Sequence, residues 1–142
     1  FYTLHTYYFA EAHIANRGLA QAMYISPMRD AIDKGLVPTN HTDFVVAPLD
    51  PMFMMWSAVN RISRGGAEVG GDERITPLEA LEAINYRLQE QGLTLNLSEV
   101  KGPVMDGLRK SDFLQHLSGK VYLTHHQAVA DLKQDDIEPY II

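Results

Sequence analysis

A helix start in the middle of the chain constrains the fold more than any other feature of this sequence. Thr76-Pro-Leu-Glu79 combines a capping threonine, a proline suited to the first helical position and a glutamate three residues after the cap. Apolar side chains then recur at the spacing of one helix face, at Leu78, Leu81, Ile84 and Leu88. Gly92 follows as a helix terminator. The sequence therefore predicts one helix here, with separate segments before and after it.

The segment before this helix alternates strand-like and helix-like stretches. Residues 1–9 are aromatic and β-prone, and residues 36–43 form a second predicted strand with a polar tip. Between them, Ser26 can cap a helix that ends at Gly35, and residues 52–62 carry apolar side chains at helical spacing. This order predicts an α/β architecture, in which functional side chains lie at the carboxyl ends of the strands.

Three polar residues fall at the carboxyl ends of the predicted strands in this interpretation: His5, His41 and Asp43. Imidazole nitrogens and a carboxylate are suitable ligands for a divalent metal, and the carboxylate can also take a proton from metal-bound water. A histidine at a strand end is more often a hydrogen-bonded structural residue. On the residues alone, both interpretations stay open.

Several motifs follow one another in this upstream segment: His5–His13, Ile25–Gly35, Thr39–Asp43, Pro48–Pro51, Trp56–Arg61 and Arg74–Leu81. This series resembles the C-terminal barrel region of metal-dependent amidohydrolases of the N-substituted formamide deformylase type. The resemblance covers residues 1 to about 84. It implies a partial (β/α) barrel and a zinc-type site for hydrolysis of C–N bonds in amides or formamides.

The resemblance also implies roles for individual residues. His5 matches a histidine metal ligand, and Asp43 matches the aspartate of the last strand, which binds metal and activates water. His41 lines the same mouth, and His13 matches a family histidine to which no role is assigned. The family's first-strand His-x-His pair and its middle-strand ligands have no counterpart in this chain. Because a catalytic zinc site has three protein ligands, we expect no catalysis by the chain as it stands.

The segment after the central helix start has its own alternation. Residues 93–98 alternate apolar and polar side chains, as a strand with one buried face does. Helical packing is predicted from Val104 to Leu117, a short strand over residues 121–124 and a last helix over residues 125–132. The predicted order, counted from Thr76, is α-β-α-β-α.

This downstream segment resembles the second half of a STAS domain, the cytoplasmic module of sulfate-permease anion transporters. The motifs that carry the resemblance are Leu78–Asn85, Leu97–Asp106, Leu108–Leu114 and Leu117–Thr124. It implies a noncatalytic regulator that binds nucleotides or partner proteins. Thr76 falls where anti-sigma antagonist relatives carry a phosphorylatable serine. The alternative, that Thr76 is only a cap, is favoured because Pro77 and Glu79 account for it.

Together these observations predict a chimera-like α/β chain. We expect an amidohydrolase-barrel-like fragment over residues 1–76 and a STAS-like half over residues 77–142, with one sheet able to run through both. Three hypotheses remain: a STAS-like interaction module, a metal-dependent amidohydrolase that needs parts absent from this chain, and a fusion without selected function. In the last case, Thr76–Asn85, which suits both families, is the point of joining.

The composition limits the classes of binding partner and the cellular compartment that we expect for the chain. The net charge of −6 argues against a nucleic-acid surface, which requires a concentrated basic patch. No apolar run approaches the roughly 20 residues of a membrane span. There is no cysteine, which excludes disulfides and thiol-ligated zinc. We expect a cytoplasmic chain that binds a protein partner or self-associates, with no cofactor unless zinc binds in the amidohydrolase interpretation.

Overall fold

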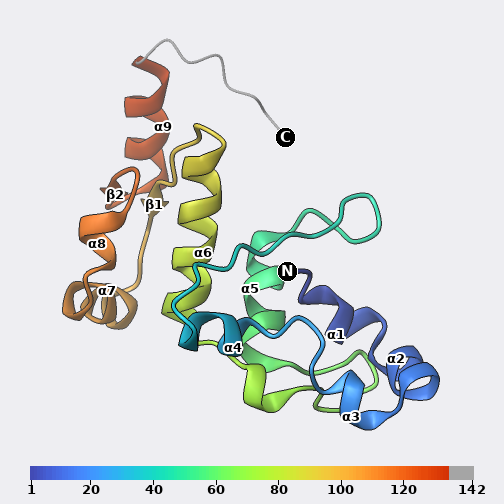
Figure 1. Cartoon of the computed structure of the whole chain (residues 1–142). Coiled ribbons are helices and arrows are strands. Elements are labelled where there is room, and N and C mark those ends of the chain that lie inside the picture. The colour runs from blue at the N-terminus through green and yellow to red at the C-terminus, as the bar shows by residue number, and fades with distance from the viewer. Residues whose placement is uncertain (135–142) are drawn as a thin grey trace. The chain divides into compact units, whose positions relative to one another are not determined.

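The computed structural model describes residues 1–134, which combine helix and strand, with helix predominating (Figure 1). The chain divides into two compact units, called here the N-terminal unit (Phe1–Arg87) and the C-terminal unit (residues 88 onward). The division falls inside one helix, α6 (Pro77–Glu90). The predicted boundary at residues 76/77 rests on sequence resemblance and stays a prediction. Across residues 1–134, no helix combines the length and the apolar character needed to cross a bilayer.

The N-terminal unit is built from short helices. In chain order they are α1 (Leu4–Tyr8), α2 (Ala10–Arg17), α3 (Leu19–Ala22), α4 (Met28–Asp33), α5 (Pro51–Asn60), the 3₁₀ helix η1 (Gly71–Glu73) and the first part of α6. Within residues 1–87, all of which the structure describes, no strand forms, although Ile62 and Glu68 make an isolated antiparallel bridge.

Two predicted strands of this unit are therefore wrong. Residues 1–9 contain helix α1, and residues 36–43 have no regular structure. A strand needs a neighbour to pair its backbone N–H and C=O groups, whereas a helical turn pairs them locally. The Phe9 N–H, for example, donates to the His5 carbonyl at 3.0 Å. The partial barrel and the shared sheet do not form in the described residues, whose one sheet lies in the C-terminal unit.

Small side chains form the largest apolar cluster of the N-terminal unit. Its buried members come from α4, α5, α6 and the residue before Thr76: Met28, Ala58, Ile75, Ala80 and Ala83. The predicted leucine stripe of α6 is only half-buried, because the alanines of the helix face the core instead. The methyl groups of these alanines allow neighbouring backbones to approach closely. The spacing of the larger apolar residues therefore predicted the helix correctly but not the face that is most buried.

The ends of the helices agree with the predictions from the sequence better than the strands do. Gly35 and Gly92 both adopt left-handed φ, at 76° and 71°, as predicted for residues that follow a helix. After α6, the Gly92 N–H donates to the Gln89 carbonyl (2.9 Å) and the Leu93 N–H to the Leu88 carbonyl (2.8 Å), which closes the last turn. The predicted cap of α4 is wrong: Pro27 occupies the cap position, and the Ser26 hydroxyl donates to the Tyr2 carbonyl at 3.0 Å.

Arg61 is fully buried at the end of α5, in a left-handed conformation with φ 56°. Its guanidinium donates to four backbone carbonyls, of Ile25, Ser26, Val69 and Gly70. Burial lowers the pKa of Arg61 to about 10, which leaves the side chain charged at neutral pH. The four carbonyls therefore take the place of water around a buried cation.

The C-terminal unit contains a small parallel sheet. Strands β1 (Leu97–Ser98) and β2 (Val121–Tyr122) pair in the register Leu97 to Val121 and Ser98 to Tyr122. The helices of the unit are α7 (Gly102–Lys110), α8 (Phe113–His116) and α9 (His125–Gln134). The order from α6 onward confirms the predicted alternation of helix and strand. The strands are shorter than predicted, and the helix expected up to residue 117 is divided between α7 and α8. Residues 135–142, part of the predicted downstream segment, lie outside the described residues.

Candidate functional site

The upstream site residues predicted from the sequence come from three elements of the N-terminal unit. His5 belongs to α1 and His13 to α2, while His41 and Asp43 lie in the segment between α4 and α5. None of these elements is one of the strand ends that the sequence predicted. Contacts other than strand pairing in a barrel must therefore bring these side chains close together.

Backbone hydrogen bonds bring the start of the chain beside residues 39–41. The Phe1 amino group donates to the Thr39 carbonyl at 2.7 Å, and the His41 N–H donates to the Phe1 carbonyl at 3.0 Å. Two bonds that flank one residue in this way are the pattern of a parallel pair of strands. The pairing extends over one residue only, and α1 begins shortly after it.

Buried side chains reinforce this junction. The Asn40 carboxamide accepts from the Thr3 N–H (3.2 Å) and donates to the Thr3 hydroxyl (2.7 Å). On the other side of Thr3, its carbonyl accepts from the hydroxyls of Thr6 (2.7 Å) and Ser57 (2.8 Å). These side chains, all 5% exposed or less, fix α1 against α5 and against residue 40. The positions of Tyr2 and His5 depend on this network.

The aromatic ring of Tyr2 lies at the centre of the predicted site residues. Its centroid is 4.3 Å from that of the His5 ring and 5.4 Å from that of the His41 ring, on which it stacks at 25°. The His5 and His13 rings are 5.2 Å apart. Sequence reasoning missed Tyr2, although its place in an aromatic run three residues before His5 was visible. The structure thus places His5 and His41 against a residue that was not predicted, with His13 beside His5.

Burial and neighbouring charges set the protonation of these groups. Desolvation lowers the pKa of His5, His13 lowers it further, and Asp43 opposes the shift. Desolvation likewise lowers the pKa of His41. Burial raises the pKa of the Tyr2 phenol, and the Asp43 carboxylate raises it further. At neutral pH the imidazoles of His5 and His41 and the phenol of Tyr2 are therefore uncharged.

One hydrogen bond fixes the tautomer of His41. Its Nδ1 accepts from the backbone N–H of Asp43 at 3.1 Å. A neutral imidazole that accepts at Nδ1 carries its proton on Nε2, so His41 presents a donor at that atom and not a free lone pair. This suits the predicted position of His41 at the mouth of a site, beside a ligand and not on a metal.

The metal interpretation is only partly matched by this geometry. His5 and Asp43 supply the donor types that zinc prefers, and a neutral imidazole is the ligating form. Across residues 1–134, however, no group of three or more histidine, aspartate or glutamate side chains is arranged to hold a metal ion. The residues present therefore fit zinc in their chemistry but not in number and placement.

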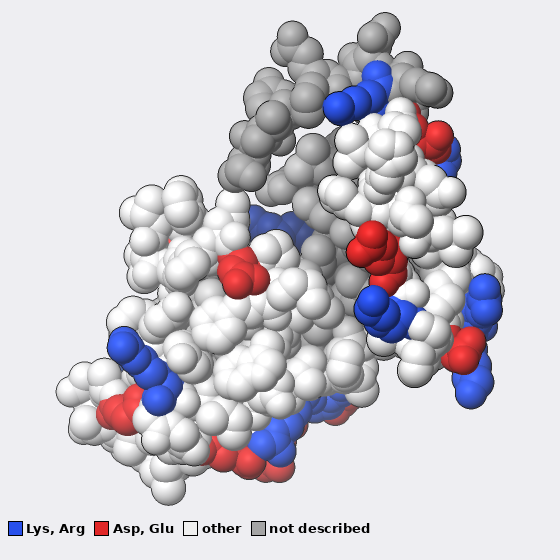
Figure 2. Space-filling view, turned by 180° about the vertical axis from the view of Figure 1, so that it is seen from behind, with Lys and Arg blue, Asp and Glu red and all other residues white. Residues whose placement is uncertain are grey.

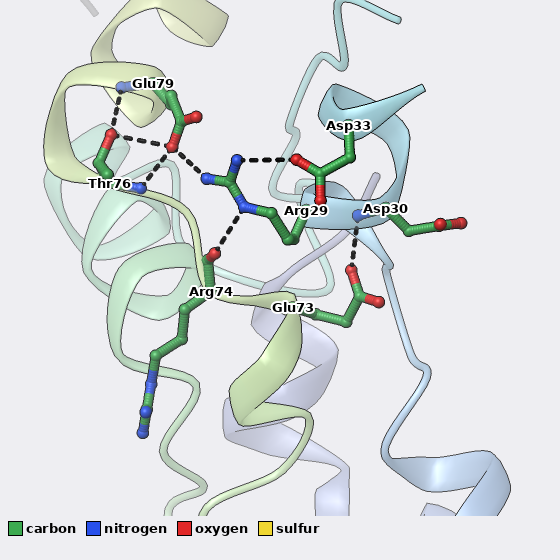
Figure 3. A network of polar contacts seen from close by, with 7 residues as sticks. All are labelled: Arg29, Asp30, Asp33, Glu73, Arg74, Thr76 and Glu79. Carbon is green, nitrogen blue, oxygen red and sulfur yellow. Dashed lines mark hydrogen bonds and ion pairs between the residues drawn. The ribbon is translucent and has the colours of Figure 1, made fainter. Parts of the chain in front are cut away.

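Thr76 lies in a polar network of the N-terminal unit (Figure 3). Its hydroxyl accepts from the Glu79 N–H (3.2 Å) and donates to Glu79 Oε2 (2.9 Å), and its own N–H donates to the same oxygen (2.7 Å). This is the predicted capping box. Arg29 of α4 also binds Glu79 and donates to the Arg74 carbonyl at 3.2 Å. The structure thus gives Thr76 a capping role, and its phosphorylation stays a prediction.

The carboxylate of Glu79 is shared by the helix cap and by Arg29. Burial alone would raise the pKa of Glu79, but the hydrogen bonds from Arg29 and Thr76 outweigh it, and that pKa is lowered. The network therefore connects the start of α6 to α4.

On the face shown in Figure 2, basic and acidic side chains are interspersed and do not gather into one basic area.

No protein-family model, curated protein or solved structure matches the chain. The resemblances to amidohydrolases and to STAS domains therefore rest on the sequence motifs alone.

Proposed function

We propose that the chain is a noncatalytic, STAS-like interaction module related to sulfate (anion) transporters, joined to a truncated amidohydrolase-like segment. The observation that carries this proposal is the parallel pairing of β1 with β2. Parallel strands need a crossover connection, and α7 and α8 supply it here. The order of elements from α6 to α9 is the one expected for the second half of a STAS domain.

Exposed apolar side chains of the C-terminal unit support binding of a partner. Leu123, directly after β2, is 84% exposed, and Val104 on α7 is 56% exposed. Apolar residues exposed beside a small sheet favour contact with another protein or with a second copy of the chain. A partner at this surface agrees with the regulatory role that the resemblance implies.

Binding to a transporter tests the proposal directly. A sulfate-permease-type transporter that lacks its own STAS domain would be immobilised in detergent, and the chain would be titrated over it with surface plasmon resonance. We expect saturable binding that Leu123→Asp weakens at least about tenfold. Val45→Asp is the matched control, because Val45 is 81% exposed but belongs to the N-terminal unit. Absence of binding, or equal loss in both variants, would contradict the proposal.

A second candidate, a metal-dependent amidohydrolase, is favoured by one observation: His5, His41 and Asp43 lie near Tyr2, and His13 lies beside His5. In this proposal His5 and Asp43 would supply two of the ligands of a zinc site, and the metal would supply polarisation of an amide carbonyl and activation of water. Asp43 would be the proton acceptor that the resemblance implies, and His41 would offer its Nε2–H as a hydrogen-bond donor. The missing ligands would come from parts that this chain does not contain.

Metal content and hydrolysis separate the two candidates. The purified chain would be loaded with zinc, dialysed and assayed for metal and for release of amine from formamides, beside Asp43→Asn as control. Stoichiometric zinc and an activity that Asp43→Asn abolishes would support the amidohydrolase candidate and would show that the chain itself supplies enough ligands. Less than about a tenth of an equivalent of zinc, against the one ion of a mononuclear site, would end this candidate for the chain by itself.

A further inference from the structure

Tyr2 carries a buried polar atom that the fold leaves unpaired. Across residues 1–134, its Oη is the buried side-chain nitrogen or oxygen atom for which no hydrogen-bond partner is found. The residue as a whole is 8% exposed. Buried hydroxyl groups are nearly always paired, so an orphan next to a cluster of polar residues calls for a functional explanation.

The surroundings of Tyr2 define what can pair with it. Its ring lies against the imidazoles of His5 and His41, and the Asp43 carboxylate is the charged group that acts on its hydroxyl. Its apolar neighbours include Leu4 and Ala47, with Phe53 packed beside them. A hydroxyl in this setting is a neutral donor at the border between a polar cluster and an apolar one.

We propose that Tyr2 is the recognition residue of a ligand site in the N-terminal unit, where its Oη–H donates to the carbonyl oxygen of a small neutral ligand with an apolar substituent. A carbonyl oxygen accepts the proton that Oη has to donate. A neutral ligand is preferred to a carboxylate because Asp43 already places a negative charge nearby. The apolar substituent contacts the cluster of Leu4 and Phe53. Binding requires no metal, so the proposal does not depend on the amidohydrolase candidate.

Access to the hydroxyl involves the segment between residue 43 and α5. Ala47 of this segment belongs to the same apolar cluster as Tyr2 and is 2% exposed, whereas residues 43–46 are exposed and have no regular structure. In this proposal the ligand reaches the hydroxyl by displacing this segment. The ligand then takes the place of Ala47 beside the ring.

Two isosteric probes and one conservative variant test the proposal. Benzamide and benzoate would be titrated into the full chain, with binding followed by NMR shifts and thermal stability measured in parallel. We expect benzamide to bind more tightly than benzoate, and Tyr2→Phe to weaken benzamide about tenfold or more. Because the lost hydroxyl is unpaired, Tyr2→Phe should leave the melting temperature unchanged or raise it. Tyr8→Phe, in the same apolar cluster, is the matched control and should alter affinity less than about twofold.

Each other result overturns the proposal. Equal benzamide affinity in the unmodified chain and in Tyr2→Phe would show that the hydroxyl is not used. A lower melting temperature of Tyr2→Phe would show that Oη has a structural partner. Tighter binding of benzoate would contradict the neutral ligand, and no binding of benzamide to the unmodified chain would remove the site.

Discussion

The two units hold themselves together in different ways. The buried polar side chains found in residues 1–134, from Thr3 to Asn85, all belong to the N-terminal unit. In the C-terminal unit the buried side chains are apolar, namely Leu108, Phe113 and Ala128, and the ordering comes from a two-strand ladder and helix caps. A unit organised by buried polar groups depends on each of them, since one lost partner leaves another buried group unpaired. The predictions below test this contrast.

The largest effect is expected at Arg61. Arg61→Met leaves the carbonyls of Ile25, Ser26, Val69 and Gly70 without their common donor, so the free energy of unfolding should fall by about 3 kcal/mol or more. Urea denaturation would measure the loss. Arg64→Met, three residues further and exposed, is the control and should change stability by less than about 0.5 kcal/mol. Similar losses of stability in Arg61→Met and Arg64→Met would contradict the special dependence on the buried side chain.

A matched pair of asparagines comes next. Asn40→Ala removes both bonds to buried Thr3, and we expect a loss of about 2 kcal/mol. Asn96 of the C-terminal unit accepts from the Lys120 N–H at 2.9 Å, but this bond is exposed. Asn96→Ala should therefore cost about 0.5 kcal/mol, because water can replace the lost acceptor. If Asn96→Ala proves as costly as Asn40→Ala in chemical denaturation, burial is not what separates the units.

Two threonine caps give a smaller contrast. Thr76→Ala removes a cap that shares Glu79 with Arg29, whereas Thr124→Ala removes a simple cap of α9, in which the Thr124 hydroxyl accepts from the Gln127 N–H at 3.1 Å. We expect losses of about 1.5 and 0.7 kcal/mol, respectively. Thermal unfolding of the two variants would measure the difference. A larger loss for Thr124→Ala would contradict the coupling of the α6 cap to Arg29.

The smallest expected effect is a pH dependence confined to the N-terminal unit. The pKa values of His5 and His41 are lowered from 6.5 in the folded chain, so the unfolded chain binds protons first on acidification. The contribution of these two histidines to stability should be complete above about pH 6.5 and be lost as the pH drops below that value. Melting temperatures between pH 7.5 and 5.5, in EDTA buffer, would show the trend. The double variant His5→Gln, His41→Gln should have a flatter profile; an unchanged slope would assign the effect to other groups.

Local signals in the sequence predicted what is locally determined. The capping box at Thr76 and the helix-ending glycines, Gly35 and Gly92, form as expected because each involves residues within one turn. The strands over residues 1–9 and 36–43 failed because an aromatic or alternating pattern does not specify the partner strand. Of the two segments, only Phe1 and residues 39–41 meet in strand-like pairing.

His5 and His41, two of the predicted site residues, lie beside Tyr2, which was not predicted. His5, His41 and Asp43 were recognised because their side chains have metal-binding chemistry. Tyr2 was not, since its importance lies in a missing partner, and a missing partner becomes visible only when all neighbours are in place. The roles of single residues in the site depend on contacts between segments about 40 residues apart, for which one sequence gives no signal.

The buried guanidinium of Arg61 affects the susceptibility of the chain to proteolysis. Arg64, Gly65 and Gly66, which follow it, are exposed and have the composition of a trypsin cleavage site. The end of this stretch, at Val69 and Gly70, is nevertheless hydrogen-bonded to the buried side chain of Arg61. A protease must extend about ten residues of substrate backbone to cut, and here both flanks are tethered. Trypsin should therefore spare this stretch in the native chain and cut it as soon as that internal anchor is lost.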